Sequence, residues 1–525
     1  MLTMVLALVL SILPMGAMAM TDADVADIVV SGLAGTDADA ATGVAVDAYR
    51  VMDVIYDDTA DQPAQPVYVW ETAVAAWVTA NYSSYIGENN AVTEAFYGLA
   101  SDTVGYGSDI ATFYDQMAAA IKGGTITLSP AGSGVGNCSL EDLEMGNYLV
   151  LIENGMKIYR PSTLNLIPTW DANGEAWTLA DGEVVIKASE PSVTKTLEVN
   201  DAAVQEAQVG DTVTYTVTAA IPVYPDNATA KGYQIGDDLP DGVTLDAASV
   251  AVVGVKAGES DVDLEAGGDK DYTLTTASGT KTGNDTAVDL LLTFDYEQIR
   301  AFDSVVITYE AAVNQNVALG TDGNENAAYL AYNNNPYDAD SWKEKEANTT
   351  FYSFGIQVTK TDETGNTLAG AEFSLSDGAG ELTFLKDETN NRYYLSSAAG
   401  SSSVLAVDEN GLLKIHGLVA GEYTLTETKA PGGYVKLQNP ITVTVTESTE
   451  TPGAVAVESE DQSGTTTVTA KEDGVVELTV ANVEGFTLPI TGGEGIMLFS
   501  LIGIVMMGGG LLVILAVLRR WKRAY

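Results

Sequence analysis

Hydrophobic positions recur with two different periods along this chain, and the change falls near Lys187. Before Lys187, strand-like apolar runs flank a middle part with two stretches in which apolar residues recur every three or four positions and no Pro or Gly interrupts the pattern. The strand-like runs include 43–51 and 148–152, and the helix-like stretches are 71–82 and 109–121. We therefore expect an α+β domain over residues 20–187.

After Lys187 the pattern changes to short alternating runs rich in Val and Thr, separated by turns of Gly, Asp, Asn and Pro. Such alternation is typical of strands with one buried face, so the rest of the folded part is expected to be β-sandwich. The tetrapeptide Val-Thr-Lys-Thr opens a strand run at 193–196 and again at 358–361. Because 525 residues are too many for one hydrophobic core, we place separate β domains at 188–350 and 351–486, with a long hairpin or loop at 447–473.

Both ends of the chain carry apolar segments of the kind that direct a protein to a membrane. Residues 2–13 are largely apolar, and Ala17-Met18-Ala19 then has the small-x-small form of a signal-peptidase site, which predicts a signal peptide over 1–19. No basic residue precedes that run, so the true start codon stays open, and a buried N-terminal helix is the alternative. Residues 496–518 are uncharged and predict a transmembrane helix with a cytoplasmic basic tail of Arg519, Arg520, Lys522 and Arg523.

A pentapeptide stands just before the predicted transmembrane helix: Leu488, Pro489, Ile490, Thr491 and Gly492. The order of pentapeptide, apolar helix and basic tail over 487–525 resembles the LPxTG sorting signal of Gram-positive surface proteins. The resemblance implies that a sortase cysteine cleaves between Thr491 and Gly492, holds the chain as a thioester and passes Thr491 to an amine. The alternative is a membrane-anchored ectodomain in which Pro489 and Gly492 only interrupt regular structure.

Composition excludes several functional classes. Lys and Arg total 24 against 73 Asp and Glu, so the formal charge of -49 repels phosphate backbones and makes nucleic acid an improbable partner. The chain has one cysteine, Cys138, and one histidine, His416, which leaves no intrachain disulfide and no ordinary transition-metal site. The sequence has no calcium-loop pattern, and we interpret Asp37 and Asp39 as solvated charges in a loop. We therefore expect neither a bound metal nor a cofactor.

Three strands in each β domain carry a polar residue on their apolar face, because alternate residues of a strand share a face. In the last domain, Lys360 shares its face with Ile356 and Val358, Glu427 with Tyr423 and Leu425, and Asn482 with Leu478 and Val480. In the middle domain, Lys195 lies with Val193 and Leu197, Asp237 with Ile235 and Leu239, and Asn326 with Ala328, Leu330 and Tyr332. Each domain thus predicts a buried group of a lysine, a carboxylic acid and an amide.

Burial gives such a group its chemistry, because it lowers the pKa of a lysine and raises that of a carboxylic acid. A neutral amine held against an Asn side chain, whose carbonyl is hydrogen-bonded by a protonated acid, can attack the amide carbon and expel ammonia. The product is a Lys–Asn isopeptide crosslink. The alternative is a lysine that extends to the rim of the sheet and forms a salt bridge, but two domains with the same three residue types in the same order favour the crosslink.

Family resemblance assigns the same residues. Residues 356–362, 368–373, 417–427 and 430–434 resemble the Cna-B/SpaA-type domain of pilins, in which a first-strand lysine, the E-box glutamate and a last-strand asparagine form an isopeptide; these roles fall on Lys360, Glu427 and Asn482. Residues 235–240 and 326–336 resemble the isopeptide-forming fimbrial domain, in which Lys195, Asp237 and Asn326 take the same parts. Spacing and parity favour these residues over their neighbours Asp238 and Asn324. The implied fold is mostly β, with tandem immunoglobulin-like or Cna-B sandwiches after the α+β domain.

The first domain resembles the N-terminal domain of backbone pilins through residues 146–150 and 158–161, ahead of Trp170. It departs from that family in two ways. Ile152 occupies the place of the E-box glutamate, so we expect no isopeptide here, and the usual Tyr-Pro-Lys motif is absent. The candidate amines for joining a second subunit are the only lysines of the domain, Lys122, Lys157 and Lys187; we favour Lys187 for its boundary position.

These patterns predict an exported, cell-wall-anchored structural subunit of a sortase-assembled pilus, stabilised by self-formed isopeptide bonds and not an enzyme. The expected partners are a sortase, peptidoglycan through a covalent bond, other pilin subunits and, before sorting, the membrane. The alternative is a non-polymerising adhesin whose first domain binds a host or polysaccharide ligand. A secreted hydrolase is disfavoured, because no Ser/His or paired-carboxylate motif has a recognisable frame.

Overall fold

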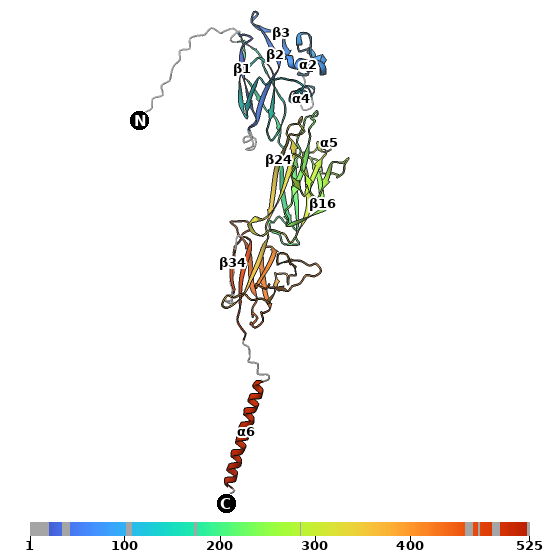
Figure 1. Ribbon diagram of the computed structural model, residues 1–525. Helices are drawn as coiled ribbons and strands as arrows, with labels where there is room; N and C mark the ends of the chain where they lie inside the picture. The colour runs from blue at the N-terminus through green and yellow to red at the C-terminus, as the bar shows by residue number, and fades with distance from the viewer. Residues whose placement is uncertain are drawn as a thin grey trace, which may run out of the picture. The chain divides into compact units, whose positions relative to one another are not determined.

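The computed structural model describes residues 20–33, 43–100, 108–172, 176–283, 285–456, 466–470, 473–485 and 494–521 (Figure 1). The chain divides into two compact units. The first holds residues up to 204, together with 212–312 and 325–350; the second holds 205–211, 313–324 and the chain from 351 onward. Strands dominate both units, as the alternating sequence pattern predicts.

The first domain contains a central sheet in the order β3-β2-β6-β8, and a smaller sheet in the order β11-β1-β5. The central sheet consists of β2 (Ala45–Asp57), β3 (Gln62–Trp70), β6 (Gly146–Glu153) and β8 (Ser162–Leu166), with β4 (Gly132–Val135) paired to β2. The smaller sheet consists of β1 (Val25–Ser31), β5 (Cys138–Glu144) and β11 (Gly182–Val185). Short strand pairs join β7 (Ile158–Tyr159) to β12 (Ala188–Ser189), and β9 (Thr169–Asp171) to β10 (Ala176–Thr178).

Strand β6 explains why this domain is layered, because both of its faces are buried. Leu149 and Leu151 pack in a core with the helices, whereas Tyr148, Val150 and Ile152 pack in a second core against the smaller sheet. The helices are α2 (Thr72–Asn81), α3 (Glu94–Ala100) and α4 (Asp109–Lys122), and Figure 1 shows α2 and α4 beside the β2–β3 region. The helices expected at 71–82 and 109–121 are confirmed, while α3 was not anticipated.

The middle sandwich has one sheet in the order β13-β14-β22-β16-β17 and another in the order β18-β21-β15-β23-β24. The first comprises β13 (Val193–Val199), β14 (Thr212–Ala220), β16 (Val243–Val255), β17 (Val262–Asp263) and β22 (Ser304–Val313). The second comprises β15 (Tyr233–Asp238), β18 (Tyr272–Thr275), β21 (Leu290–Phe294), β23 (Asn324–Asn333) and β24 (Trp342–Phe351). Strand β14 has the burial expected of a half-buried strand, with every second residue inside.

The last sandwich follows the same plan, with sheets in the orders β27-β28-β30-β25-β35-β34 and β29-β26-β31-β32-β33. The first contains β25 (Phe354–Asp362), β27 (Phe384–Asp387), β28 (Arg392–Leu395), β30 (Leu412–Leu418), β34 (Thr466–Ala470) and β35 (Val475–Asn482). The second contains β26 (Glu372–Ser376), β29 (Leu405–Ala406), β31 (Gly421–Lys429), β32 (Ile441–Glu447) and β33 (Val455–Ala456). The region expected to be a hairpin or loop, 447–473, thus contributes two short strands to the sheets.

Beyond the sandwiches, helix α6 (Glu494–Trp521) is red in Figure 1. Within it, residues Ser500–Arg520 form a stretch that is long and apolar enough to cross a membrane. Arg519 and Arg520 lie in the last turn of the helix. The predicted signal peptide, the pentapeptide 488–492, and Lys522 and Arg523 lie outside the described residues.

Candidate functional site

In the middle sandwich, the predicted lysine and acid are in direct contact across the core. Lys195 lies on β13 in one sheet and Asp237 on β15 in the other, and the Lys195 Nζ is 2.7 Å from each carboxylate oxygen of Asp237. The lysine side chain is 0% exposed and that of Asp237 is 1% exposed. The fold therefore contains the salt bridge of the alternative, but not a lysine that extends to the rim and the solvent.

The third residue, Asn326, lies on β23 beside the acid. Asp237 is paired with Ala328 in the β15–β23 ladder, so Asn326, two residues away, faces the same side. Asn326 is fully buried, and its Nδ2 donates a hydrogen bond of 2.8 Å to the Tyr309 hydroxyl. Its Oδ1 has no hydrogen-bond partner in the described part of the chain. The fold thus brings Lys195, Asp237 and Asn326 to one interior location.

Burial shifts both charged groups of this sandwich toward their neutral forms. Burial lowers the pKa of Lys195 to about 8, although the charge of Asp237 opposes the change. Burial likewise raises the pKa of Asp237, while Lys195 and a hydrogen bond with Tyr309 oppose the increase. Proton transfer from the ammonium to the carboxylate is therefore far easier here than in water. It leaves a nucleophilic amine beside a protonated acid.

In the last sandwich, the lysine and the asparagine lie on adjacent parallel strands. Lys360 on β25 is paired with Val480 on β35, and Asn482 follows two residues later on the same face. The Lys360 Nζ donates a hydrogen bond of 2.7 Å to the Val480 carbonyl oxygen. Lys360 is 0% exposed, and burial lowers its pKa to about 8 against the opposing charge of Glu427.

The acid of the last sandwich contacts the amide. Glu427 comes from β31 in the opposite sheet, and its Oε2 accepts hydrogen bonds from the Asn482 Nδ2, at 3.0 Å, and the Leu437 backbone N–H, at 2.7 Å. Glu427 Oε1 and Asn482 Oδ1 are buried without partners among the described residues. We expected the acid to donate to the amide carbonyl; in both sandwiches the described hydrogen bonds instead leave that oxygen open.

Asp238 and Asn324, the neighbours that could be confused with Asp237 and Asn326, lie in different surroundings. Asp238 is exposed, whereas Asp237 is buried. Asn324 is buried, but its side chain is hydrogen-bonded to the backbone of Ala318. Its Oδ1 accepts from the Ala318 N–H at 2.8 Å, and its Nδ2 donates to the Ala318 carbonyl oxygen at 3.0 Å. This side chain closes the loop before β23 and is not available to a lysine.

Comparison with known proteins identifies both sandwiches. A family model described as the Cna-B-like domain of Gram-positive pilin backbone subunit 2 matches residues 209–336, and the SpaA prealbumin-like fold domain matches residues 354–463. Both sandwiches are pilin-type domains. The expected fold class, with its SpaA and Cna-B sandwiches, is thereby confirmed.

Two curated relatives, a surface protein and a fimbrial subunit, each match about half of this chain. The Trypsin-resistant surface T6 protein of Streptococcus pyogenes serotype M6 is 26% identical over 268 residues, which are 48% of this chain and 45% of that protein. Fimbrial subunit type 1 of Actinomyces viscosus is 25% identical over 357 residues, 59% of this chain and 62% of the relative. The chain therefore spans about half the length of these curated relatives.

A solved structure shares the fold over most of the chain. The T6 backbone pilin of serotype M6 S. pyogenes, described as a modular three-domain structure, superposes with a TM-score of 0.58 at 18% identity. The match covers 89% of this chain and 100% of that one. It shows that this chain shares the fold of that protein over most of its length.

The first domain has no acid at the corresponding strand position. Ile152, which replaces the E-box glutamate, is 6% exposed and belongs to the core between the two sheets. Its neighbours in that core include Val46, Tyr148 and Val184. An apolar side chain fits this location because an unpaired carboxylate there would be costly to bury.

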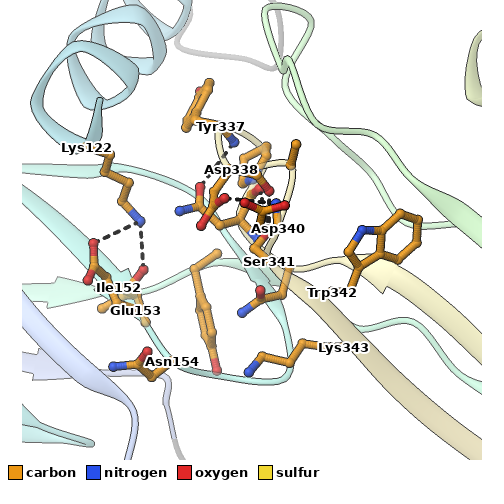
Figure 2. A pocket seen from close by; sticks show the side chains of 15 residues that line it. Lys122, Ile152, Glu153, Asn154, Tyr337, Asp338, Asp340, Ser341, Trp342 and Lys343 are labelled. Atoms are coloured by element: carbon orange, nitrogen blue, oxygen red, sulfur yellow. Dashed lines mark hydrogen bonds and ion pairs between the residues drawn. The ribbon is translucent and has the colours of Figure 1, made fainter. Parts of the chain in front are cut away.

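Two of the three candidate acceptor lysines are engaged within the fold. Lys122 ends α4; its Nζ donates to the Ile152 carbonyl oxygen at 3.1 Å and is 3.7 Å from Glu153, as Figure 2 shows on one side of a pocket of about 530 Å³. Burial lowers the pKa of Lys122. Lys157 pairs with Glu190 at 3.1 Å, and the lysine side chain is 13% exposed.

Lys187 differs from both. It is exposed, lies between β11 and β12, and lines a cavity of about 470 Å³ together with Asp115 and Arg160. Its backbone carbonyl accepts a hydrogen bond from the Arg160 N–H at 3.0 Å, which holds the main chain while the side chain faces outward. No described residue forms an ion pair with its ammonium group.

Sequence reasoning missed several groups at these sites. Tyr215 and Tyr309 adjoin the middle triad, which is Lys195, Asp237 and Asn326. Aromatic residues at alternating positions nevertheless look like ordinary core. Lys281 was also missed: it is 1% exposed, its Nζ lies 2.6 Å from Glu344 and 3.5 Å above the Tyr329 ring centroid. The alternating pattern around 279–282 is too short to have shown that this lysine is buried.

Proposed function

We propose that this chain is a structural subunit of a sortase-assembled, cell-wall-anchored pilus, and that its two pilin-type sandwiches are closed by Lys195–Asn326 and Lys360–Asn482 isopeptide bonds. One observation carries the proposal: each sandwich buries a first-strand lysine with an acid and an asparagine from other strands. Isolated buried lysines are costly, and two such groups in one chain need a common explanation.

The proposed reaction uses only groups within each sandwich. In the last sandwich, a neutral Lys360 Nζ attacks Asn482 Cγ, and Glu427, already in contact with Nδ2, carries protons from the attacking amine to the departing ammonia. The strands hold the reactants together, so no bimolecular encounter is needed. Each site reacts once, which makes the protein a structural component and not an enzyme.

Assembly and anchoring are proposed from the chain ends and the exposed lysine. A sortase would cleave after Thr491 and transfer that residue either to peptidoglycan or to Lys187 of a second subunit. Helix α6, with Arg519 and Arg520 in its last turn, would retain the chain in the membrane until cleavage. The exposure of Lys187 supports it as the acceptor, because an acyl-sortase must reach the amine.

Intact mass measurement tests the crosslinks. The exported chain should have lost the mass of two ammonia molecules, and peptide mapping should find 195 joined to 326 and 360 joined to 482. Lys360→Ala and Glu427→Ala should each restore one ammonia and lower the melting temperature of the last sandwich; by analogy with a disulfide, the lost stability is roughly 2–4 kcal/mol. Lys429→Ala, an exposed lysine of the same sandwich, is the control and should leave the mass deficit intact. A chain with its full unmodified mass would contradict the proposal.

A further inference from the structure

Two tyrosines face the middle triad from the sheet that carries Lys195. Tyr215 on β14 and Tyr309 on β22 are paired directly in the ladder, and their ring centroids are 5.3 Å apart. Both residues are fully buried. The Lys195 Nζ lies 5.1 Å from the Tyr215 ring centroid and 5.9 Å from that of Tyr309. The reacting amine is therefore enclosed by two phenol rings.

The Tyr309 hydroxyl of this pair contacts the amide that is to be attacked. The Tyr309 hydroxyl accepts the 2.8 Å hydrogen bond from Asn326 Nδ2. Its interaction with Asp237 opposes the burial-driven rise in the pKa of that acid. The Tyr215 hydroxyl is buried without a hydrogen-bond partner among the described residues, as is Asn326 Oδ1. Burial, reinforced by the charge of Asp237, raises the pKa of Tyr215, so its hydroxyl stays protonated and able to donate a hydrogen bond.

The two pilin-type sandwiches differ at this point. In the last sandwich, Glu427 contacts the leaving nitrogen of Asn482 directly. In the middle sandwich, both oxygens of Asp237 contact Lys195, and Tyr309 occupies the position between the acid and the amide nitrogen. Aspartate is one methylene shorter than glutamate, so a relay through a second side chain supplies the missing reach.

We infer that Tyr309 is a catalytic residue that relays a proton from Asp237 to the departing nitrogen of Asn326, and that Tyr215 donates a hydrogen bond to Asn326 Oδ1 as that oxygen becomes negative. This inference rests on the proposed Lys195–Asn326 bond. An orphaned buried donor and an orphaned buried acceptor each carry a desolvation cost in the ground state. A hydrogen bond from Tyr215 to Asn326 Oδ1 that forms only as the tetrahedral intermediate develops its charge removes this desolvation cost. It therefore stabilises the transition state more than the ground state.

The proton balance of the step is complete without an external reagent. The Lys195 ammonium first gives one proton to the Asp237 carboxylate, and the neutral Nζ then attacks Asn326 Cγ. Asp237 passes its proton to the Tyr309 oxygen as Tyr309 gives its own proton to Nδ2, and Asp237 recovers a proton from the attacking Nζ. The Cγ–Nδ2 bond breaks and ammonia leaves. Of the three ammonium protons, one remains on the new amide, one on Asp237, and one departs with ammonia.

The rate of crosslinking in Tyr309→Phe and Tyr215→Phe variants tests the inference. Phenylalanine fills the same space and removes only the hydroxyl. The full-length chain is synthesised in a cell-free system with lipid vesicles, and the 195–326 and 360–482 crosslinked peptides are quantified over time. We expect Tyr309→Phe to slow the 195–326 crosslink by roughly 10²-fold, the lower end for proton-transfer catalysis, and Tyr215→Phe to slow it by a similar factor. The 360–482 crosslink in the same molecules should keep its wild-type rate.

Two further measurements separate chemistry from packing. Tyr272→Phe removes a hydroxyl from β18 of the same sandwich and should leave both rates unchanged. In Tyr309→Phe the residual rate should fall as pH rises, because the departing nitrogen must then be protonated from solvent; a packing defect would slow the reaction equally at every pH. A Tyr309→Phe chain that crosslinks at the wild-type rate, or slows without that pH dependence, overturns the relay. Absence of the 195–326 crosslink in the wild-type chain would instead refute the proposed bond itself.

Discussion

At the residue scale, His416 is the clearest case of a side chain whose protonation is set by its neighbours. Its Nε2 lies 2.8 Å from the Val317 carbonyl oxygen, to which it donates, and its ring is in contact with the Arg392 guanidinium. Burial, reinforced by the Arg392 charge, lowers the pKa of His416 to about 4. The histidine thus joins the last sandwich to the segment 313–324 as a neutral hydrogen-bond donor.

This lowered pKa predicts a measurable titration. In the unfolded chain the imidazole should titrate near pH 6.5, so acidification protonates the unfolded state first and destabilises the fold as the pH falls from about 6.5 toward 4. The contribution is at most about 3.4 kcal/mol, because the pKa falls by roughly 2.5 units at 1.36 kcal/mol each. Because the chain has a single histidine, its imidazole NMR signals report this site alone. We expect no protonation above about pH 5 in the folded chain, with the denatured chain as the control; a folded-state midpoint near 6.5 would contradict the structure.

At the element scale, three turns of the second unit cross at glycines. Gly320 has a φ of +74°, and a Cβ there would lie 2.2 Å from the Asp473 carbonyl carbon. A Cβ on Gly474 would lie 2.4 Å from Gly320 Cα, and one on Gly453 would lie 2.5 Å from the Gly320 carbonyl oxygen. Backbone atoms cannot move aside as flexible side chains do, so this crossing tolerates only glycine.

We therefore expect Gly320→Ala to destabilise the last sandwich by well over the ~1 kcal/mol that a left-handed conformation alone costs. Gly365→Ala is a matched control, because Gly365 has a φ of +91° in the same sandwich but no atom within 4 Å of the position that an alanine methyl group would take. Calorimetric melting of the two variants gives the comparison. Equal losses of stability would show that the backbone crossing contributes nothing beyond the φ angle.

At the scale of the whole molecule, charge bears on how subunits could associate. Each chain has a formal charge of -49, so copies repel one another, although salt screens the repulsion beyond about 8 Å under physiological conditions. A covalent link between subunits maintains association despite this repulsion. The proposed transfer of Thr491 to an exposed lysine would supply such a link.

Lys187→Arg tests the acceptor at this scale. Arginine retains the positive charge, but its guanidinium cannot be deprotonated to act as a nucleophile, so an SDS-resistant ladder in cell-wall extracts should disappear. Lys157→Arg is the control; it retains a cation beside Glu190 and should leave the ladder unchanged. A ladder that persists in Lys187→Arg would show that Lys187 is not the sole acceptor. If the wild-type chain contains the Thr491–Lys187 branched peptide and the variant loses that peptide but keeps the ladder, a second amine substitutes for Lys187.

The sequence by itself determined the features that repeat along the chain. Strand alternation, the period of the two helices and the uncharged C-terminal run predicted the fold class and the apolar helix, because local periodicity decides which face of an element is buried. The same parity singled out Lys195, Asp237 and Asn326, and their counterparts in the last sandwich, since a polar residue on an apolar face stands out. Whether these residues react remains a prediction.

The tertiary structure alone decided which groups meet between elements. No local pattern shows that Tyr215 and Tyr309 pair across β14 and β22 beside the middle triad, or that Asp237 contacts the lysine while Glu427 contacts the amide. Likewise, the expected boundary at 187/188 is crossed by the pairing of β12 with β7. These arrangements depend on strand order and on contacts between residues far apart in the chain, whereas sequence periodicity reports only the facing of each residue within its own element.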